Sequence, residues 1–113
     1  MSVTPAMTLG QEEVFGPVLA VMAVRDFEET LAVANDVCFG ISSSVYTASP
    51  EQALRVVEET DVGLTHVNMP IAFKQPMLSF GGVKESGFGI PETGSSGIEF
   101  CSEHKVVYVR YAR

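Results

Sequence analysis

The pattern of apolar and polar positions predicts short strands and short helices in turn along the first part of the chain. Val18–Val24 is an unbroken run of aliphatic residues, which is typical of a strand buried on both faces. Asp26 then stands where a helix N-cap is expected, and apolar residues at helical spacing predict a helix through about Asn35. Glu28 and Glu29, in the first turn, suit the positive end of the helix dipole.

The same alternation repeats further along the chain. Ile41–Tyr46 predicts a second strand. Ser49 followed by Pro50 predicts the start of a second helix, which continues to about Thr60. Leu64–Val67 predicts a third strand. The order strand, helix, strand, helix, strand with short connections indicates an α/β fold, in which a parallel βαβαβ unit is joined by crossover helices.

The ends of the chain carry a different pattern. Met1–Gly10 shows no period and is expected to be irregular. Asn68–Ser79 contains two prolines and no period, so a shaped loop is predicted there. The glycine-rich stretch Phe80–Gly89 follows, and Pro91–Phe100 predicts a short helix. Lys105–Tyr111 has alternating side chains and predicts a strand that is exposed or that pairs with a partner.

The composition indicates one globular domain with more apolar surface than a chain of this size can bury. The chain has 113 residues, of which 46% are hydrophobic and 19% charged, and its mean hydropathy is +0.22. A domain of this size buries only about 60–70% of its unfolded surface. Some apolar surface is therefore expected to stay uncovered unless a partner covers it.

Charge and cysteine content exclude several classes of function. The 14 acidic residues outnumber the 7 basic ones, which disfavours nucleic acid as a partner. The longest apolar run has seven residues, far short of the roughly 20 that span a bilayer, so no membrane span is expected. Two cysteines form no disulfide framework and no secretory leader is visible, so we expect a cytoplasmic protein.

Common catalytic and metal-binding motifs do not occur in the sequence. It contains no phosphate-binding loop, no G-x-G-x-x-G and no G-x-S-x-G. Cys101 and His104 form only one half of a metal-ligand spacing, so no metal site is expected. Cys38 is expected to be a small buried residue and not a nucleophile. His66 is expected to be a packed or hydrogen-bonded side chain and not a general base.

Two segments carry residues that a plain structural role does not explain. In Glu12–Pro17, two carboxylates and an aromatic residue precede the apolar run. These carboxylates are either exposed and idle or directed at a ligand, because one ionised carboxylate can accept hydrogen bonds from two neighbouring ribose hydroxyls. In Phe80–Gly87, dense glycines allow the backbone to approach another backbone or a ligand closely, and the aromatic ring at the edge is placed to line a pocket.

Six segments of the chain match a known family in order and at natural spacing. They are Gln11–Pro17, Asn35–Asp36 with Gly40, Ser44–Thr47, Gly63–Asn68, Ser79–Gly89 and Glu103–Val107. The two most specific patterns are E-E-x-F-G-P and F-G-G-x-K-x-S-G. Together the segments resemble the C-terminal portion of the NAD(P)-dependent aldehyde dehydrogenase superfamily, from about Met7 onward. The resemblance implies that residues 1–104 are the C-terminal part of a catalytic domain and residues 105–113 an oligomerisation strand.

The resemblance also implies roles for individual residues. Glu13 is expected to reach the nicotinamide ribose hydroxyls, and Phe15 to pack beside that ribose and the nicotinamide ring. Asn68 corresponds to the asparagine at a strand end before the loop that lines the substrate entrance, and Phe80 to an aromatic residue that walls the aldehyde tunnel. Lys105–Tyr111 corresponds to a strand that joins a partner subunit's sheet, which implies a homo-oligomer.

The sequence departs from the family in its catalytic residues. The family's nucleophile is a cysteine in a G-Q-x-C context and its general base a glutamate in an E-L-G-G context; neither context occurs here, so no catalytic residue is assigned in this chain. In a complete enzyme the resemblance implies oxidation of an aldehyde to a carboxylic acid through a cysteine thiohemiacetal, with NAD or NADP as cofactor. Alone, the chain is expected to be a truncated, inactive piece that binds no cofactor. The alternative is a non-catalytic association module that pairs with a full-length relative.

Lys74 is the candidate residue for substrate recognition. Ala72–Pro76 and Lys84–Glu92 are similar to the branch that oxidises oxoglutarate semialdehyde (2,5-dioxopentanoate) and related semialdehydes. The resemblance then implies that Lys74 pairs with the far carboxylate of an acidic substrate. The alternative, left open by the sequence, is a solvated loop lysine.

Overall fold

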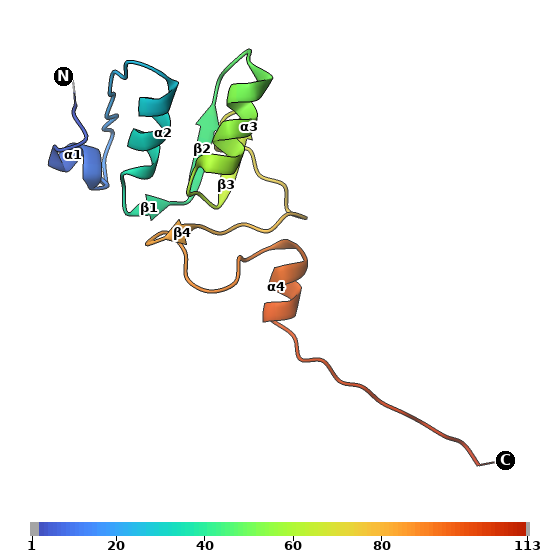
Figure 1. The fold of residues 1–113 in the computed structure, drawn as a ribbon. Coiled ribbons are helices and arrows are strands. Elements are labelled where there is room, and N and C mark those ends of the chain that lie inside the picture. The colour runs from blue at the N-terminus through green and yellow to red at the C-terminus, as the bar shows by residue number, and fades with distance from the viewer. Residues whose placement is uncertain (1–2, 113) are drawn as a thin grey trace.

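In a computed structural model, residues 3–112 form short helices and two separate two-stranded sheets (Figure 1). The elements in order are α1 (Thr8–Gln11), α2 (Phe27–Asn35), β1 (Phe39–Gly40), β2 (Ser42–Val45), α3 (Pro50–Glu59), β3 (Leu64–Val67), β4 (Val83–Lys84) and α4 (Gly94–Phe100). The structure describes residues 3–112. Residues 1–2, in the predicted segment 1–104, and residue 113, in the predicted segment 105–113, lie outside the described residues.

The parallel sheet predicted from the sequence forms between β2 and β3. Its register pairs Ser42 with Leu64 and Val45 with Val67, so both strands run in the same direction. Helix α3 connects the two strands and packs on β3 (Figure 1). The mixed helix and strand order of an α/β fold is therefore confirmed for this part of the chain.

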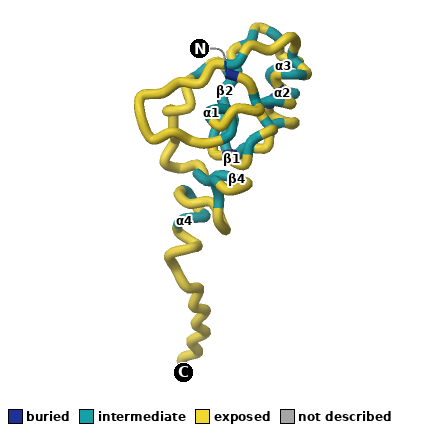
Figure 2. The backbone as a smooth tube through the Cα atoms, turned by 90° about the vertical axis from the view of Figure 1, so that its left-hand side faces the viewer, coloured by how far each residue is buried: buried dark blue, intermediate teal, exposed yellow. Residues whose placement is uncertain are grey.

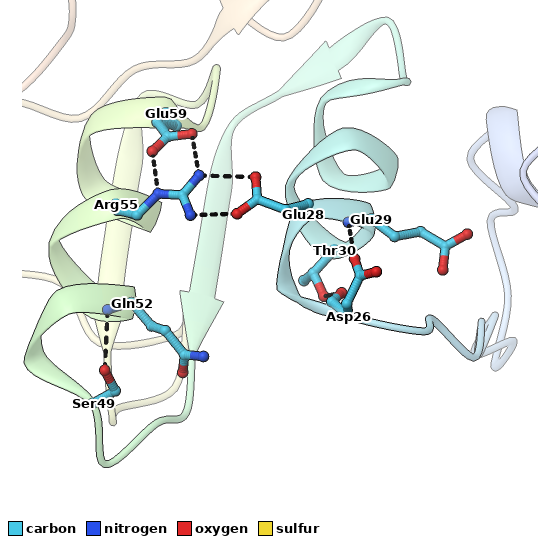
Figure 3. Close-up of polar contacts among 8 residues, drawn as sticks. All are labelled: Asp26, Glu28, Glu29, Thr30, Ser49, Gln52, Arg55 and Glu59. Carbon is cyan, nitrogen blue, oxygen red and sulfur yellow. Dashed lines mark hydrogen bonds and ion pairs between the residues drawn. The ribbon is translucent and has the colours of Figure 1, made fainter.

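Both predicted helix starts are confirmed by their caps. The Asp26 carboxylate accepts a hydrogen bond from the backbone N–H of Glu29 at 2.8 Å. The Ser49 hydroxyl accepts one from the N–H of Gln52 at 3.3 Å, and Pro50 occupies the first helical position (Figure 3). Each cap satisfies a donor that would otherwise lack a partner at the helix start.

Arg55 joins the two helices through a charged cluster. Its guanidinium on α3 donates to both carboxylate oxygens of Glu28 on α2 and to both of Glu59 one turn along its own helix (Figure 3). The guanidinium also stands 5.1 Å from the centroid of the Phe27 ring. These hydrogen bonds lower the pKa of Glu28 and of Glu59 below their ordinary value of 4.5.

The lowered pKa values predict a specific pH dependence. A carboxyl group whose pKa is lower in the folded state stabilises that state above its unfolded pKa, and the contribution is lost as pH falls through the folded value. Arg55→Met should therefore destabilise the protein at neutral pH, and its deficit relative to wild type should shrink below pH 4.5. Urea unfolding across this pH range measures the effect. Arg55→Lys keeps the positive charge but loses the planar guanidinium that donates to both carboxylates, so its free energy of unfolding should lie between those of wild type and Arg55→Met. A difference in the free energy of unfolding between wild type and Arg55→Met that stays constant with pH would contradict this prediction.

The first predicted strand does not form. Val18–Val24 belongs to no helix or strand. Among the described residues, the backbone hydrogen bond that joins it to another segment runs from the N–H of Val3 to the carbonyl of Val21 at 3.3 Å. The prediction of burial is also wrong here, since the Leu19 and Val21 side chains are 85% and 61% exposed. An aliphatic run favours burial, but a strand also needs a neighbour to pair with, and this segment has none in residues 3–112.

Smaller differences concern the ends of the chain. Residues 8–11, expected to be irregular, form the single turn α1. The last helix begins at Gly94 and not at the predicted Pro91, because Thr93 before it has a left-handed φ of 68°. Two residues of the glycine-rich stretch form β4, which pairs antiparallel with β1.

The predicted excess of apolar surface is visible along the chain. The buried apolar side chains among residues 3–112 are Val3, Leu31 and Val56. After α4 the backbone runs outward as an exposed, extended segment (Figures 1 and 2), and the molecule measures 80 Å along its long axis. Within Lys105–Tyr111, the predicted strand, every residue is exposed. None of the helices in residues 3–112 is long and apolar enough to cross a membrane.

Candidate functional site

Asn68 fixes the point at which the loop leaves the parallel sheet. It follows β3 directly and has a left-handed φ of 54°. Its side-chain oxygen accepts from the N–H of Thr47 at 2.9 Å, and its amide nitrogen donates to the carbonyl of Thr47 at 3.0 Å. The amide thus ties the chain after β3 to the chain after β2. A contact between Asn68 and substrate stays a prediction.

Lys74 and Phe80 lie together at the wall that two cavities share. The Lys74 ammonium stands 3.9 Å from the centroid of the Phe80 ring, within the range of a cation–π interaction. One cavity, of about 270 Å³, is bounded by β3 and the loop after it. The other, of about 240 Å³, lies toward Pro76 and Thr93. The structure therefore brings together two of the residues for which the sequence predicted substrate contact.

The glycine-rich segment is anchored by side chains whose role the sequence did not reveal. The Lys84 ammonium donates to the carbonyls of Asn35 and Val37, at 2.8 and 3.1 Å, at the end of α2. The Ser86 hydroxyl accepts from the N–H of Gly40 at 3.0 Å. A cation at a helix C-terminus is favourable, but nothing in the local sequence pairs residue 84 with α2. Lys84 and Ser86 thus hold the glycine-rich segment against α2 and β1.

The glycines of this segment, together with Gly63 before β3, permit a very close approach of backbones. A Cβ atom on Gly63 would lie 1.7 Å from the carbonyl oxygen of Gly81. A Cβ atom on Gly87 would lie 1.7 Å from the carbonyl oxygen of Gly82. The close backbone approach predicted from the dense glycines is confirmed, and it is an approach of backbone to backbone.

Glu13 and Phe15 lie on the exposed segment between α1 and α2. Phe15 is 95% exposed, and the Glu13 carboxylate makes no hydrogen bond or ion pair with any of residues 3–112. Neither residue lines the two cavities beside Lys74 and Phe80. The structure thus does not bring the predicted cofactor residues next to the predicted substrate residues, and their roles stay predictions.

The cysteines and histidines have surroundings that differ from one another. Cys38, expected to be buried, is exposed, as is Cys101. Desolvation of the sulfur and the nearby Glu85 carboxylate raise the pKa of the Cys38 thiol, which disfavours the thiolate that a nucleophile needs. His66 is 7% exposed and hydrogen-bonded, as predicted. In the part of the chain that the structure describes, no group of three or more His, Cys, Asp or Glu side chains gathers as metal ligands would.

Comparison with known proteins decides the family. The profile described as the aldehyde dehydrogenase family matches residues 1–107. The chain belongs to the aldehyde dehydrogenase family. This confirms the resemblance that the ordered motifs indicated.

Two relatives of this aldehyde dehydrogenase chain act on semialdehydes according to their names. The α-ketoglutaric semialdehyde dehydrogenase of Bacillus subtilis is 39% identical over 109 residues, covering 96% of this chain and 22% of that protein. The α-ketoglutarate semialdehyde dehydrogenase of Haloferax volcanii is 44% identical over 110 residues, covering 96% of this chain and 23% of that protein. The chain thus spans less than a quarter of the length of these relatives.

A solved structure supports the arrangement of the elements. The NAD-dependent aldehyde dehydrogenase of Sinorhizobium meliloti superposes with a TM-score of 0.82 at 36% identity, covering 98% of this chain and 22% of that one. The chain as a whole is therefore similar in fold to a stretch of that aldehyde dehydrogenase.

Proposed function

We propose that this chain is the C-terminal portion of an NAD(P)-dependent aldehyde dehydrogenase that oxidises an acidic semialdehyde to the corresponding carboxylic acid. The observation that carries the proposal is the Lys74 ammonium over the Phe80 ring, at a wall shared by two cavities. The names of the two semialdehyde dehydrogenases of similar sequence support the substrate class.

In this proposal the catalytic thiol and the general base stand elsewhere in the complete enzyme. Both cysteines of this chain lack the sequence context of the family's nucleophile, and Cys38 has a raised thiol pKa. The chain supplies walls and positioning groups, and we expect it to be inactive alone. Such groups contribute by holding reacting atoms in line, which is a large part of many rate enhancements.

The residues of the E-E-x-F-G-P segment are suited to hold a nicotinamide cofactor. The exposed Glu13 carboxylate has both oxygens available, so it can accept hydrogen bonds from two ribose hydroxyls. The exposed Phe15 ring offers a flat apolar surface beside them. When bound, the nicotinamide accepts a hydride from the substrate. In this proposal Glu13 and Phe15 orient the ribose and the ring, in a protein that also contains the remaining parts of the cofactor site.

Lys74 is proposed to recognise the far carboxylate of the substrate. It lies on the loop that leaves β3, and its ammonium keeps donors free because the Phe80 contact uses the ring face alone. Phe80 holds the ammonium at the wall of the cavity bounded by β3, whose lining also includes the apolar side chains of Leu64, Met69 and Leu78. A charge-assisted hydrogen bond there would favour a carboxylate over a neutral group.

Replacement of Lys74 tests this proposal. In the full-length enzyme, Lys74→Ala should raise KM for a carboxylate-bearing aldehyde about tenfold or more, because a hydrogen bond between charged groups is lost. KM for a neutral aldehyde of similar length should change less than about twofold. The measurement is steady-state kinetics on both aldehydes.

A second variant separates charge from packing. Lys74→Met keeps an unbranched apolar stem over Phe80 and removes the ammonium, so it should behave as Lys74→Ala does on the acidic aldehyde. An equal loss on both aldehydes in either variant would remove the proposed role of Lys74.

The exposed C-terminal segment is proposed to pair with the sheet of another subunit through Lys105–Tyr111. Every residue of this segment is exposed and its backbone is extended, which leaves its N–H and C=O groups available for strand addition. The same feature favours a second candidate function, a non-catalytic module that associates with a full-length relative. Size-exclusion chromatography combined with NAD titration separates the two. An enzyme portion alone should self-associate and bind NAD poorly, whereas an association module should elute together with a full-length relative.

A further inference from the structure

His66 links the parallel sheet to the middle of the loop that carries Lys74. The ring is buried on β3, and its Nε2 atom lies 3.0 Å from the carbonyl oxygen of Phe73. On the other side, Nδ1 lies 3.2 Å from the carbonyl oxygen of Ser43 and 3.4 Å from the hydroxyl of Ser42, both on β2. The imidazole thus bridges two strands and a loop.

The contact at Phe73 fixes the role of one ring nitrogen. A carbonyl oxygen only accepts, so a hydrogen bond to Phe73 needs the ring hydrogen on Nε2. With the hydrogen on Nε2, Nδ1 can accept from the Ser42 hydroxyl at 3.4 Å. The Lys74 ammonium is the charged group that shares the β3 cavity with the ring.

The Phe73 carbonyl belongs to the peptide plane that leads into Lys74. Because a peptide unit is planar, holding that carbonyl also fixes the direction in which the Lys74 backbone continues. The loop has further anchors toward its ends: the Ser44 hydroxyl donates to the carbonyl of Met69 at 2.7 Å, and the Thr93 hydroxyl donates to that of Leu78. His66 anchors the part between them.

We propose that His66 is a positioning residue that holds the loop through Phe73 and so places the Lys74 ammonium where it meets the substrate carboxylate. This inference rests on the proposed function for its substrate class, but the loop contact itself does not depend on it. The role is one of placement, since His66 is buried and its two ring nitrogens lie within hydrogen-bond distance of β2 on one side and of the loop backbone on the other.

Two variants of similar polarity separate the contacts of the ring. Glutamine places its amide nitrogen near the position of Nε2, whereas asparagine, one carbon shorter, places it near that of Nδ1. His66→Gln should therefore keep the bond to Phe73, and His66→Asn should lose it while keeping the reach to Ser43. Thr30→Val, which removes an exposed hydroxyl-to-carbonyl bond on α2, is the control for the loss of a hydrogen bond elsewhere.

The experiment combines hydrogen exchange and kinetics in the full-length enzyme. Loss of one net hydrogen bond predicts that His66→Asn raises the exchange rate of the amides of residues 71–75 and 77, and KM for a carboxylate-bearing aldehyde, by about three- to tenfold each. His66→Gln should recover most of both effects. Thr30→Val should change neither.

The two readouts distinguish failure of this inference from failure of the proposed function. Faster exchange in His66→Asn with KM raised equally for acidic and neutral aldehydes supports the positioning role and contradicts the carboxylate-binding role of Lys74. The positioning role is overturned if the loop amides of His66→Asn exchange at the wild-type rate. It is also overturned if His66→Asn and His66→Gln raise that exchange rate equally.

Discussion

Alanine in place of Gly87 is expected to lower the free energy of unfolding by about 3 kcal/mol or more, the upper end of the usual cost of overpacking. The added Cβ would lie 1.7 Å from the carbonyl oxygen of Gly82 and 2.4 Å from its carbonyl carbon. Both atoms belong to the backbone, so no side-chain rotation relieves the clash. The turn that brings residues 82 and 87 together, which also carries the anchors Lys84 and Ser86, would have to open. Urea unfolding of the variant measures the loss.

Gly97→Ala is the matched control for this prediction. A Cβ at Gly97 in α4 meets its nearest neighbour, the carbonyl carbon of Glu92, at 3.9 Å, an ordinary contact. Alanine there should leave stability unchanged or raise it by about 0.5–1 kcal/mol, because glycine is the poorer helix former. Similar unfolding midpoints for the Gly87 and Gly97 variants would show that the close approach does not constrain the fold.

Glu13→Gln is expected to slow hydride transfer in the full-length enzyme by about 100-fold, the scale at which a small misplacement of reacting groups acts. The amide has the size of the carboxylate but offers one neutral acceptor oxygen in place of two charged ones, so it holds the two ribose hydroxyls more weakly. Binding of the adenine end of the cofactor should weaken much less. The measurement is the single-turnover rate of reduced cofactor formation, together with the cofactor Kd.

Glu12→Gln is the control for Glu13→Gln. It removes a neighbouring exposed carboxylate of the same segment and should leave the single-turnover rate nearly unchanged. If Glu13→Gln changed neither the rate nor the cofactor constant, the proposed ribose contact would be wrong. If both variants slowed the reaction equally, the general charge of the segment would matter and not the position of Glu13.

The helices were predictable because their signals are local, and the parallel strand pair because the order strand, helix, strand with short connections favours it. The Asp26 and Ser49 caps reach backbone N–H groups three residues further along, at Glu29 and Gln52. Such contacts depend on residue type and spacing within one turn, which the sequence displays directly. The motifs that indicated the aldehyde dehydrogenase family are likewise short and continuous, and the family comparison confirms them.

The candidate site was predictable only in part. Lys74 and Phe80 were singled out from the sequence, and the structure places the ammonium over the ring. The anchoring roles of Lys84 and His66 were not predicted, because their partners are defined by the path of the chain. Lys84 reaches Asn35 across 49 positions, and no periodicity encodes that contact.

The failure of the strand prediction at Val18–Val24 shows the same distinction. Apolar content specifies that a segment is to be buried, whereas strand pairing and burial require a neighbour that residues 3–112 do not provide. The sequence alone thus determined the helices through their caps and the β2–β3 pair through the order of the elements. Its motifs determined the family, and its composition determined the excess of apolar surface. The backbone approach of Gly63 to Gly81 and the anchors of the loop depended on contacts between distant segments, which exist only once the chain has folded. The exposure of Val18–Val24 followed because no segment of residues 3–112 covers it.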